Sequence, residues 1–310
     1  MPAPADSDDR APPIGRSRGR RWRRALGVAA AILLAAYAAL WIVRAARDFV
    51  PVRARPVLAG GPLVIAHRGA SASEAENSTG AYWRALADGA DVLELDVQLS
   101  RDGAIVVSHD STLTRALGVP MAIGESDLAA LRAQLAAHHP GVNPAALLPT
   151  LDEVMEQFPR VRLNVELKTD SAALADAVAA AVERHGRADQ VLVASFHGDA
   201  LRRFRSASRG RVATSASMGE AARFYICYLL DVPGRPDYEA LQIPPRLRSS
   251  WPRFRLDSAA FVAFAHRHGL AVQYWTIDDE ATIASLLGAG ADGIMTNAPA
   301  RAVAVRGTRR

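Results

Sequence analysis

From Leu63 onward, short β-branched runs alternate with alanine-rich stretches of helical character, and this alternation restricts the possible folds more than any other feature. The predicted strands are Leu63–Ala66, Val92–Val97, Ile105–Ser108, Val161–Leu167, Val191–Ala194, Arg211–Ala213, Ala240–Ile243, Ala271–Thr276 and Gly293–Met295. Such alternation favours a parallel sheet, and about eight units favour a closed (β/α)8 TIM barrel. A doubly wound open sheet is the alternative, but it usually carries a glycine-rich phosphate loop after its first strand, and none is present.

The stretch Asp110–Thr150 departs from this alternation. It contains one helical pattern, Ser126–His138, followed by a proline-rich loop. We interpret it as a short insertion after the third predicted strand, lying over one end of the barrel. There it would shape the entrance for a substrate.

The N-terminal 60 residues differ in charge from the rest of the chain. They hold 11 arginines against 4 aspartates, whereas the remaining residues hold 26 basic and 28 acidic groups. A nucleic-acid-binding domain needs an excess of basic residues on its folded surface. The near-neutral remainder therefore predicts no nucleic-acid partner.

Residues 25–43 form an uncharged run of 19 residues, bracketed by Trp22 and Trp41. This length and these flanks predict one transmembrane helix, and the arginine excess before it predicts a cytoplasmic N-terminus. The globular part would then be extracytoplasmic, either periplasmic or extracellular, and held at the cell membrane. A cleaved signal peptide is the alternative, although its apolar core usually spans only roughly 7–15 residues.

Four parts follow from these patterns. The predicted boundaries are a disordered basic arm at 1–24, a transmembrane helix at 25–43, a stalk at 44–60 and a barrel domain at 61–310. The arm lacks the apolar periodicity that a folded segment needs.

Acidic side chains share one face of two predicted strands. Glu94 and Asp96 are two residues apart, so they point the same way and into a barrel if their apolar neighbours pack under the helices. Glu166 has the same placement in its own strand. Three inward carboxylates repel one another unless a cation lies between them, and oxygen ligands suit Mg²⁺ or Ca²⁺. For an isolated Glu-x-Asp pair, a salt bridge to arginine is the alternative.

Basic and imidazole side chains accompany these carboxylates. Lys168 is the only lysine among 37 Lys and Arg residues, which suggests a site that needs a compact ammonium, although chance survival would also explain it. His67 and His109 each follow a predicted strand, at the functional end of a barrel. Two imidazoles can divide the acid and base roles of phosphodiester cleavage, and Arg68 can grip phosphate with two hydrogen bonds.

An ordered series of motifs runs through the predicted barrel to about Pro299. It includes His67-Arg68-Gly69, Glu76-Asn77-Ser78, Glu94-Leu95-Asp96-Val97, Val107-Ser108-His109-Asp110, Glu166-Leu167-Lys168, Tyr274-Trp275-Thr276-Ile277 and Gly290-Ala291-Asp292-Gly293. In this order the motifs resemble those of the glycerophosphodiester phosphodiesterase family, in its bacterial form with an N-terminal membrane anchor.

The resemblance implies a (β/α)8 barrel that hydrolyses glycerophosphodiesters to glycerol 3-phosphate and an alcohol. It implies roles for nine residues: the divalent-metal ligands Glu94, Asp96 and Glu166, the acid–base pair His67 and His109, the phosphate-holding Arg68 and Lys168, Asn77 in the surrounding shell, and Trp275 as a wall of the glycerol pocket. It leaves open whether the nucleophile is water or the neighbouring glycerol hydroxyl, which would give a cyclic phosphate.

The chain departs from the family pattern at Ala75, where proline is usual, and at Asn297, where aspartate is common. Neither position is an implied ligand. The predicted anchor would keep the barrel near lipid, so a lysophospholipase D or a phosphoinositide phospholipase C-like activity is the alternative. An inactive barrel that serves as a binding module is a third hypothesis, but such relatives normally lose a ligand or a histidine.

Overall fold

The computed structural model describes residues 17–45, 52, 54–246 and 255–308, and divides the chain into two units, Met1–Phe49 and Val50–Arg310. The first unit contains helix α1 (Ser17–Ala45), which begins within the segment predicted to be disordered because arginine and alanine favour helix. Among the described residues, no helix combines the length and apolar character needed to cross a bilayer. The transmembrane helix predicted at 25–43 is therefore without support. Residues 1–16 of the predicted arm lie outside the described residues.

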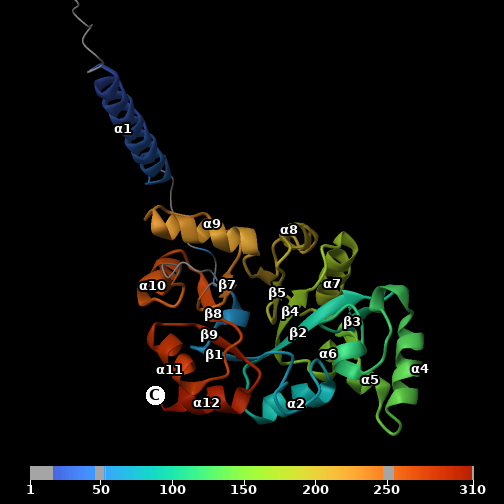
Figure 1. The fold of residues 1–310 in the computed structure, drawn as a ribbon. Coiled ribbons are helices and arrows are strands. Elements are labelled where there is room, and N and C mark those ends of the chain that lie inside the picture. The colour runs from blue at the N-terminus through green and yellow to red at the C-terminus, as the bar shows by residue number, and fades with distance from the viewer. Residues whose placement is uncertain (1–16, 46–51, 53, 247–254, 309–310) are drawn as a thin grey trace, which may run out of the picture. The chain divides into compact units, whose positions relative to one another are not determined.

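The second unit is a (β/α)8 barrel, as predicted (Figure 1). Its eight parallel strands are β1 (Leu63–Ala66), β2 (Val92–Leu99), β4 (Arg162–Leu167), β5 (Val191–Ala194), β6 (Ala213–Thr214), β7 (Ala240–Ile243), β8 (Ala271–Tyr274) and β9 (Gly293–Thr296). They follow the order β6-β5-β4-β2-β1-β9-β8-β7. A parallel bridge between Ser215 and Ala240 closes the ring between β6 and β7.

Helices cover the outside of these strands. They are α2 (Thr79–Ala87), α6 (Leu151–Gln157), α7 (Ala172–Arg184), α8 (Gly198–Ala207), α9 (Met218–Leu229), α10 (Ala259–Arg267), α11 (Glu280–Gly288) and α12 (Pro299–Gly307). Alternate residues of β2 and β4, such as Leu93, Leu95 and Val165, pack beneath them and are fully buried. Their burial leaves the intervening residues facing the barrel interior.

The strand predicted at Ile105–Ser108 is not part of the barrel. It forms β3 (Ile105–Val107) and pairs antiparallel with β2, Val97 lying opposite Val107. The connection between β2 and β3 is a short turn, and a short turn can join only antiparallel strands. The prediction that His109 ends a parallel barrel strand is therefore wrong. The hairpin instead returns the chain to the level of Asp96, whose carbonyl accepts from Ser108 N at 2.9 Å.

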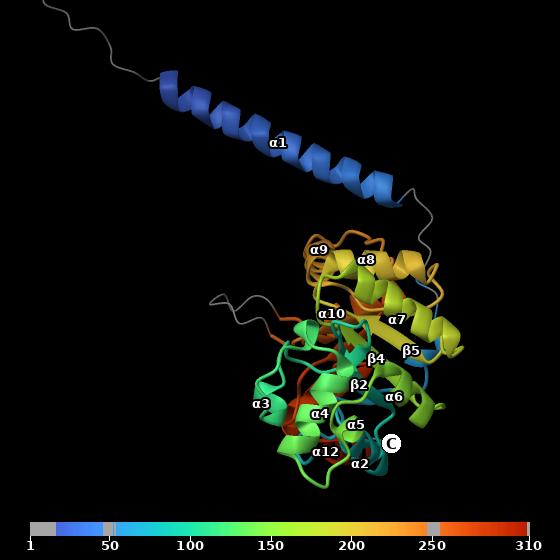
Figure 2. The same cartoon turned by 90° about the vertical axis from the view of Figure 1, so that its right-hand side faces the viewer.

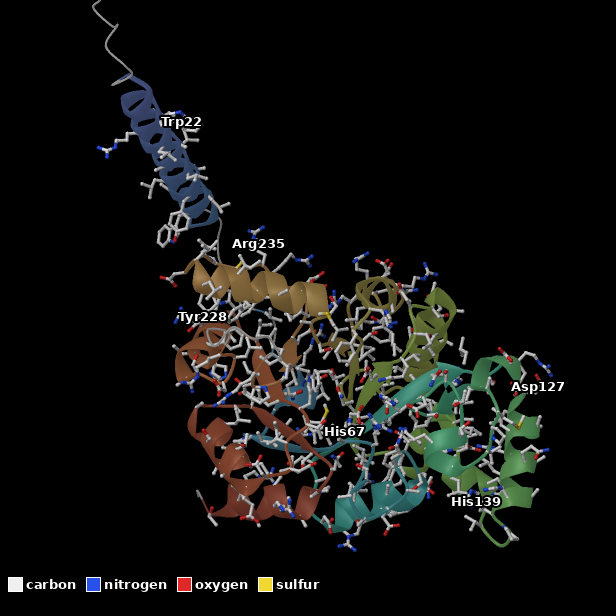
Figure 3. All side chains as sticks on the ribbon, in the orientation of Figure 1. Trp22, His67, Asp127, His139, Tyr228 and Arg235 are labelled. Atoms are coloured by element: carbon white, nitrogen blue, oxygen red, sulfur yellow. The ribbon has the colours of Figure 1, made fainter. Side chains whose placement is uncertain are left out.

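The predicted insertion follows β3. It contains α3 (Thr114–Leu117), the 3-10 turn η2 (Ile123–Glu125), α4 (Leu128–His138) and α5 (Pro144–Leu147). Its own apolar core includes Leu113, Ile123 and Leu131, and Val106 of β3 joins this core. Figure 1 shows α4 and α5 on one side of the barrel, the side that faces the viewer in Figure 2, and in Figure 3 Asp127 and His139 of the insertion lie away from His67 at the centre of the domain.

The second half of the predicted stalk belongs to the barrel. The turn η1 (Pro56–Leu58) places Val57, which is 2% exposed, against Leu192 and Ala213. Arg162, at the start of β4, donates to the carbonyls of Val57 and Ala59. An apolar residue can thus close the end of the barrel where the strands begin, which the prediction of a stalk at 44–60 did not foresee.

Candidate active site

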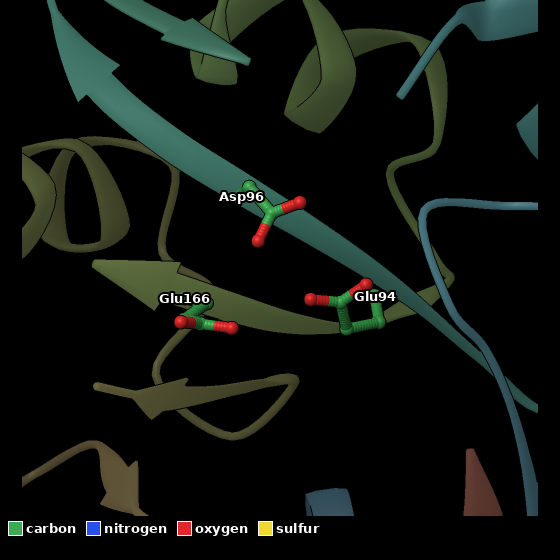
Figure 4. Close-up of side chains that lie close together, drawn as sticks. All are labelled: Glu94, Asp96 and Glu166. Atoms are coloured by element: carbon green, nitrogen blue, oxygen red, sulfur yellow. The ribbon is translucent and has the colours of Figure 1, made fainter. Parts of the chain in front are cut away.

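Three carboxylates meet inside the barrel, where β2 and β4 run side by side (Figure 4). Asp96 lies directly across from Glu166 in the register of the two strands, and Glu94 precedes Asp96 on the same face. One oxygen from each of the three lies within 4.8 Å of the others. Glu94 and Asp96 are each 1% exposed. The convergence expected from strand periodicity is therefore present.

The electrostatics of this cluster favour a bound cation. Burial, followed by the charges of Asp96 and Glu166, raises the pKa of Glu94 well above its usual value. Burial and the charge of Asp96 likewise raise the pKa of Glu166. Asp96 Oδ1 is buried and accepts no hydrogen bond. A buried carboxylate oxygen without a donor, beside two further carboxylates, fits a hard dication such as Mg²⁺ or Ca²⁺.

Two basic side chains flank the carboxylates. Lys168 Nζ lies 2.9 Å from Glu166 Oε1 and 3.4 Å from Asp96 Oδ1. Burial alone would lower the pKa of Lys168, but these two carboxylates outweigh it and the pKa is raised. Arg68 Nε lies 3.2 Å from Asp96 Oδ2. The predicted phosphate-holding residues therefore stand at the edge of the acidic cluster.

The loop between β1 and α2 has the backbone conformation that this arrangement requires. Arg68 and Asn77 both have positive φ, 56° and 59°, a left-handed conformation that costs energy for residues other than glycine. Arg68 N donates to Glu94 Oε2 at 2.7 Å, and Asn77 Nδ2 donates to Asp96 Oδ2 at 2.9 Å. Tyr82 orients Asn77 by donating its hydroxyl to Oδ1. Asn77 thus supports a carboxylate of the cluster, and its implied place in the metal or phosphate shell stays a prediction.

His67 is held by an amide from the opposite end of the chain. Its Nδ1 lies 2.7 Å from Asn297 Oδ1. Asn297 Nδ2 in turn donates to Asp278 Oδ2 at 2.7 Å, which assigns Oδ1 as the acceptor and places a proton on His67 Nδ1. Burial lowers the pKa of His67. The neutral imidazole therefore presents an unprotonated Nε2.

His109 is held by a carboxylate. Its Nδ1 lies 2.6 Å from Asp110 Oδ1, and Arg115 Nε donates to Asp110 Oδ2 at 2.5 Å. The hydrogen bond from Arg115 lowers the pKa of Asp110, so this side chain is ionised and accepts from the histidine. Gln98 Nε2 donates to the carbonyls of Ser108, His109 and Asp110, which fixes the backbone here.

Trp275 follows β8 and contributes an apolar surface. It packs against the barrel cluster that contains Ile65 and Met295. Its ring meets Phe196, which follows β5, in an edge-to-face contact with centroids 5.7 Å apart. Phe196 is 46% exposed. Since both aromatics follow the carboxyl ends of barrel strands, they line the same end of the barrel as the carboxylates.

Several supporting residues were missed by the sequence analysis. These are Tyr82, Gln98, Arg115 and Asp278. Arg115 offered one signal, since it is a cation five residues after the His-Asp pair. The others carry no local pattern, because they act through contacts with residues distant in the sequence.

A TIM barrel with acidic, basic and imidazole groups at the carboxyl ends of its strands belongs to the class of barrel enzymes. Residues 67–301 match the model of the glycerophosphoryl diester phosphodiesterase family, so the chain belongs to this family and is a glycerophosphodiester phosphodiesterase.

Relatives and solved structures agree with this assignment. The chain is 30% identical over 250 residues to a probable glycerophosphodiester phosphodiesterase 2 of Mycobacterium tuberculosis, covering 77% of this chain and 88% of the relative. It is 26% identical over 259 residues to the human lysophospholipase D GDPD3, covering 76% and 81%.

Two solved structures share the fold. A putative glycerophosphoryl diester phosphodiesterase of Silicibacter pomeroyi is 22% identical with a TM-score of 0.66, covering 83% of this chain and 98% of that one. A phosphodiesterase of Oleispira antarctica, solved with the product sn-glycerol-3-phosphate, is 24% identical with a TM-score of 0.61, covering 80% and 97%.

Proposed function

We propose that this enzyme hydrolyses glycerophosphodiesters to glycerol 3-phosphate and an alcohol by a divalent-metal-dependent reaction with two histidines as base and acid. The observation that carries the proposal is the buried cluster of Glu94, Asp96 and Glu166, in which an oxygen of Asp96 lacks a hydrogen-bond donor. These three side chains would hold the ion, either Mg²⁺ or Ca²⁺. The bound ion would supply a Lewis acid for the phosphoryl oxygens.

The chain's own residues perform the remaining work. Lys168 and Arg68 present an ammonium and a guanidinium to the phosphate, and their charges oppose the negative charge that grows on its oxygens. Both side chains are only partly exposed, so these charges act with little screening by water.

The different partners of the two histidines support different roles for them in the proposed reaction. His67 is neutral with an unprotonated Nε2, so it takes a proton from the nucleophile, which is either water or the neighbouring hydroxyl of the glycerol. The attacking oxygen bonds to phosphorus as the bond from phosphorus to the alcohol oxygen breaks. His109, whose Nδ1 donates to Asp110, delivers a proton from Nε2 to the departing oxygen. In the cyclic-phosphate route the histidines return these protons when water opens the ring, and in the direct route they exchange them with solvent, so the protons balance over one turnover.

The experiment that tests the proposal is release of glycerol phosphate from glycerophosphocholine by the purified full chain. We expect turnover with added Mg²⁺ or Ca²⁺, and loss of turnover after chelation that either ion reverses. Undiminished turnover in chelator would show that the reaction does not need a divalent ion. No turnover with any divalent ion would refute the activity.

A second candidate substrate is lysophospholipid. The observation in its favour is the exposed apolar ring of Phe196 against Trp275, which suits an alkyl chain near the site. The similarity to a lysophospholipase D supports it. Phe196→Ser should lower kcat/KM for lysophosphatidylcholine more than for glycerophosphocholine, and an equal change for both would exclude a lipid-contacting role for Phe196.

The localisation stays a prediction. A catalytic domain on the extracytoplasmic side of the cell membrane was inferred from residues 25–43, and the described helices offer it no support. Cell fractionation, combined with protease accessibility of the intact cell, tests it. Recovery of the full chain in the supernatant after cell lysis and ultracentrifugation would exclude a membrane location.

A further inference from the structure

Arg115, in helix α3 of the insertion, pairs with two carboxylates that each contact a proposed active-site side chain. Its Nε donates to Asp110 Oδ2 at 2.5 Å. Its Nη2 and Nη1 donate to Glu76 Oε1 and Oε2 at 2.5 and 3.0 Å. On the far sides, Asp110 Oδ1 lies 2.6 Å from His109 Nδ1, and Glu76 Oε1 accepts from Arg68 Nη1 at 3.1 Å. A continuous chain of charged hydrogen bonds thus links His109, Asp110, Arg115, Glu76 and Arg68.

We propose, on the basis of the proposed function, that Arg115 is a positioning residue that fixes His109 and Arg68 relative to each other. The two groups must act on one phosphate from different sides: one gives a proton to the leaving oxygen and the other holds a phosphoryl oxygen. They come from separate segments, the β1–α2 loop and the end of the β2–β3 hairpin. From the insertion, Arg115 joins the partners of both groups.

The chemistry of arginine suits this role. The planar guanidinium uses Nε for one carboxylate and both terminal nitrogens for the other, so it fixes the angle between them as well as the distance. Lysine has one nitrogen on a flexible stem and cannot reproduce this fork. The charges also favour it. Burial raises the pKa of Glu76, but Arg115 and Arg68 outweigh burial, so the net pKa is lowered and the carboxylate is ionised.

Contacts other than those of Arg115 hold the backbone around it. Gln98 holds the backbone of residues 108–110 through three carbonyls. The buried cluster that contains Leu113 and Leu131 holds the insertion. The side chain of Arg115 is 52% exposed. Its loss should therefore release the side chains of Asp110 and Glu76 while the insertion stays folded.

Kinetics of Arg115→Met test the proposal first. Removal of a side chain that orients groups at an active site typically costs about 10–100-fold in activity, and we expect kcat to fall within that range. The kcat of Arg115→Lys should be similarly low, because lysine cannot bind both carboxylates in the same geometry. The matched control is Arg101→Met, because Arg101 is also a largely exposed arginine and makes a two-point pair with Asp127 away from the site. Values of kcat for the two methionine variants within twofold of each other would overturn the proposal.

A mutant cycle tests the link itself. Glu76→Gln and Asp110→Asn should affect kcat non-additively when Arg115 is present, because each change loosens the same connection. In an Arg115→Met background the two effects should become additive. Additive effects in both backgrounds would show that the two carboxylates act independently, which contradicts the proposal.

One readout does not depend on turnover. Histidine-selective ¹⁵N NMR of the full chain reports which ring nitrogen carries a proton and how it is hydrogen-bonded, with His109→Gln and His67→Gln assigning the two signals. Arg115→Met should move the ring-nitrogen shifts of His109 and leave those of His67 in place; Arg101→Met should move neither. An unmoved His109 would overturn the positioning role, whereas absent turnover in the wild type would refute only the proposed function.

Discussion

The two histidines of the site are held by different parts of the molecule. His67 is hydrogen-bonded to Asn297, which follows barrel strand β9 and is itself fixed by Asp278. His109 is hydrogen-bonded to Asp110, which is fixed by Arg115 of the insertion. One imidazole therefore has a neutral amide as its partner, and the other has a carboxylate.

This difference separates the two chemical roles. A neutral acceptor orients an imidazole without adding negative charge, so burial can lower the pKa of His67 and keep it ready to take a proton. A carboxylate orients an imidazole and also neutralises the charge of a protonated ring. In the proposed mechanism, the barrel thus supplies the base and the insertion supports the acid.

Replacing either histidine should have the largest effect. His67→Gln and His109→Gln should each lower kcat for glycerophosphocholine about 10²–10⁴-fold, the usual contribution of an acid or base. A p-nitrophenyl diester, whose leaving group needs no proton, should recover much of the activity of His109→Gln but not of His67→Gln. The control is His138→Gln, an exposed histidine of the insertion. Recovery in the His67 variant instead would reverse the assignment.

Asp96 contacts both regions, and Asp96→Asn removes the carboxylate proposed to hold the ion while it keeps the backbone contact to Ser108. Its carboxylate contacts Asn77 and Arg68 on one side, and its carbonyl accepts from Ser108 on the other. We expect Asp96→Asn to lower kcat at least about 10²-fold. A divalent ion at 100 times its Kd stabilises a folded protein by about 2.7 kcal/mol, or about 5–10 °C in Tm for a domain of this size.

That thermal shift should appear in the wild type and in the control Asp102→Asn, whose carboxylate lies outside the cluster, and should vanish in Asp96→Asn. Differential scanning fluorimetry with and without Mg²⁺ or Ca²⁺ measures it. An undiminished shift in Asp96→Asn would place the ion elsewhere.

Exchanging the partner of His67 should have a smaller effect. The double variant Asn297→Asp with Asp278→Asn keeps the hydrogen bonds but moves the carboxylate next to His67. A carboxylate favours the imidazolium, so the pKa of His67 should rise. In the pH profile of kcat/KM, the limb at low pH should then shift to higher pH, and kcat/KM at neutral pH should fall about 3–10-fold. A limb that stays in place would show that another group sets it.

Much of this arrangement could be predicted from the sequence because it depends on local periodicity. The two-residue spacing of Glu94 and Asp96 fixes their common face once their neighbours are buried, and β1, β5 and β7 have the predicted bounds. The error at β3 was one of topology. Its residues are β-branched and buried, as is common in a strand, but the short preceding turn is what indicates an antiparallel partner.

Residues that act at a distance could not be predicted in this way. Asp278 matters because Asn297 is next to it in space, and Arg115 matters because it reaches Glu76, 39 residues away. The same holds for Val57, which the sequence places in a stalk and the structure places against the barrel interior. Such contacts depend on the closed barrel and leave no periodic pattern in the chain.

The smallest expected effect concerns stability and follows from the lowered pKa of His67. Because burial lowers the pKa of His67, the unfolded chain takes up a proton below about pH 6.5 that the folded chain does not. The free energy of unfolding should therefore fall as the pH drops below 6.5, by about 1.4 kcal/mol for each unit of pKa difference, and level off below the folded-state pKa. His67→Gln lacks this component. As the pH is lowered from about 8 to 5.5, its free energy of unfolding should therefore fall less than that of the wild type, as measured by urea unfolding with chelator present. If the difference in unfolding free energy between the two proteins is the same at both pH values, His67 titrates alike in the folded and unfolded chain. The contrast between its amide partner and the carboxylate partner of His109 would then have no electrostatic consequence.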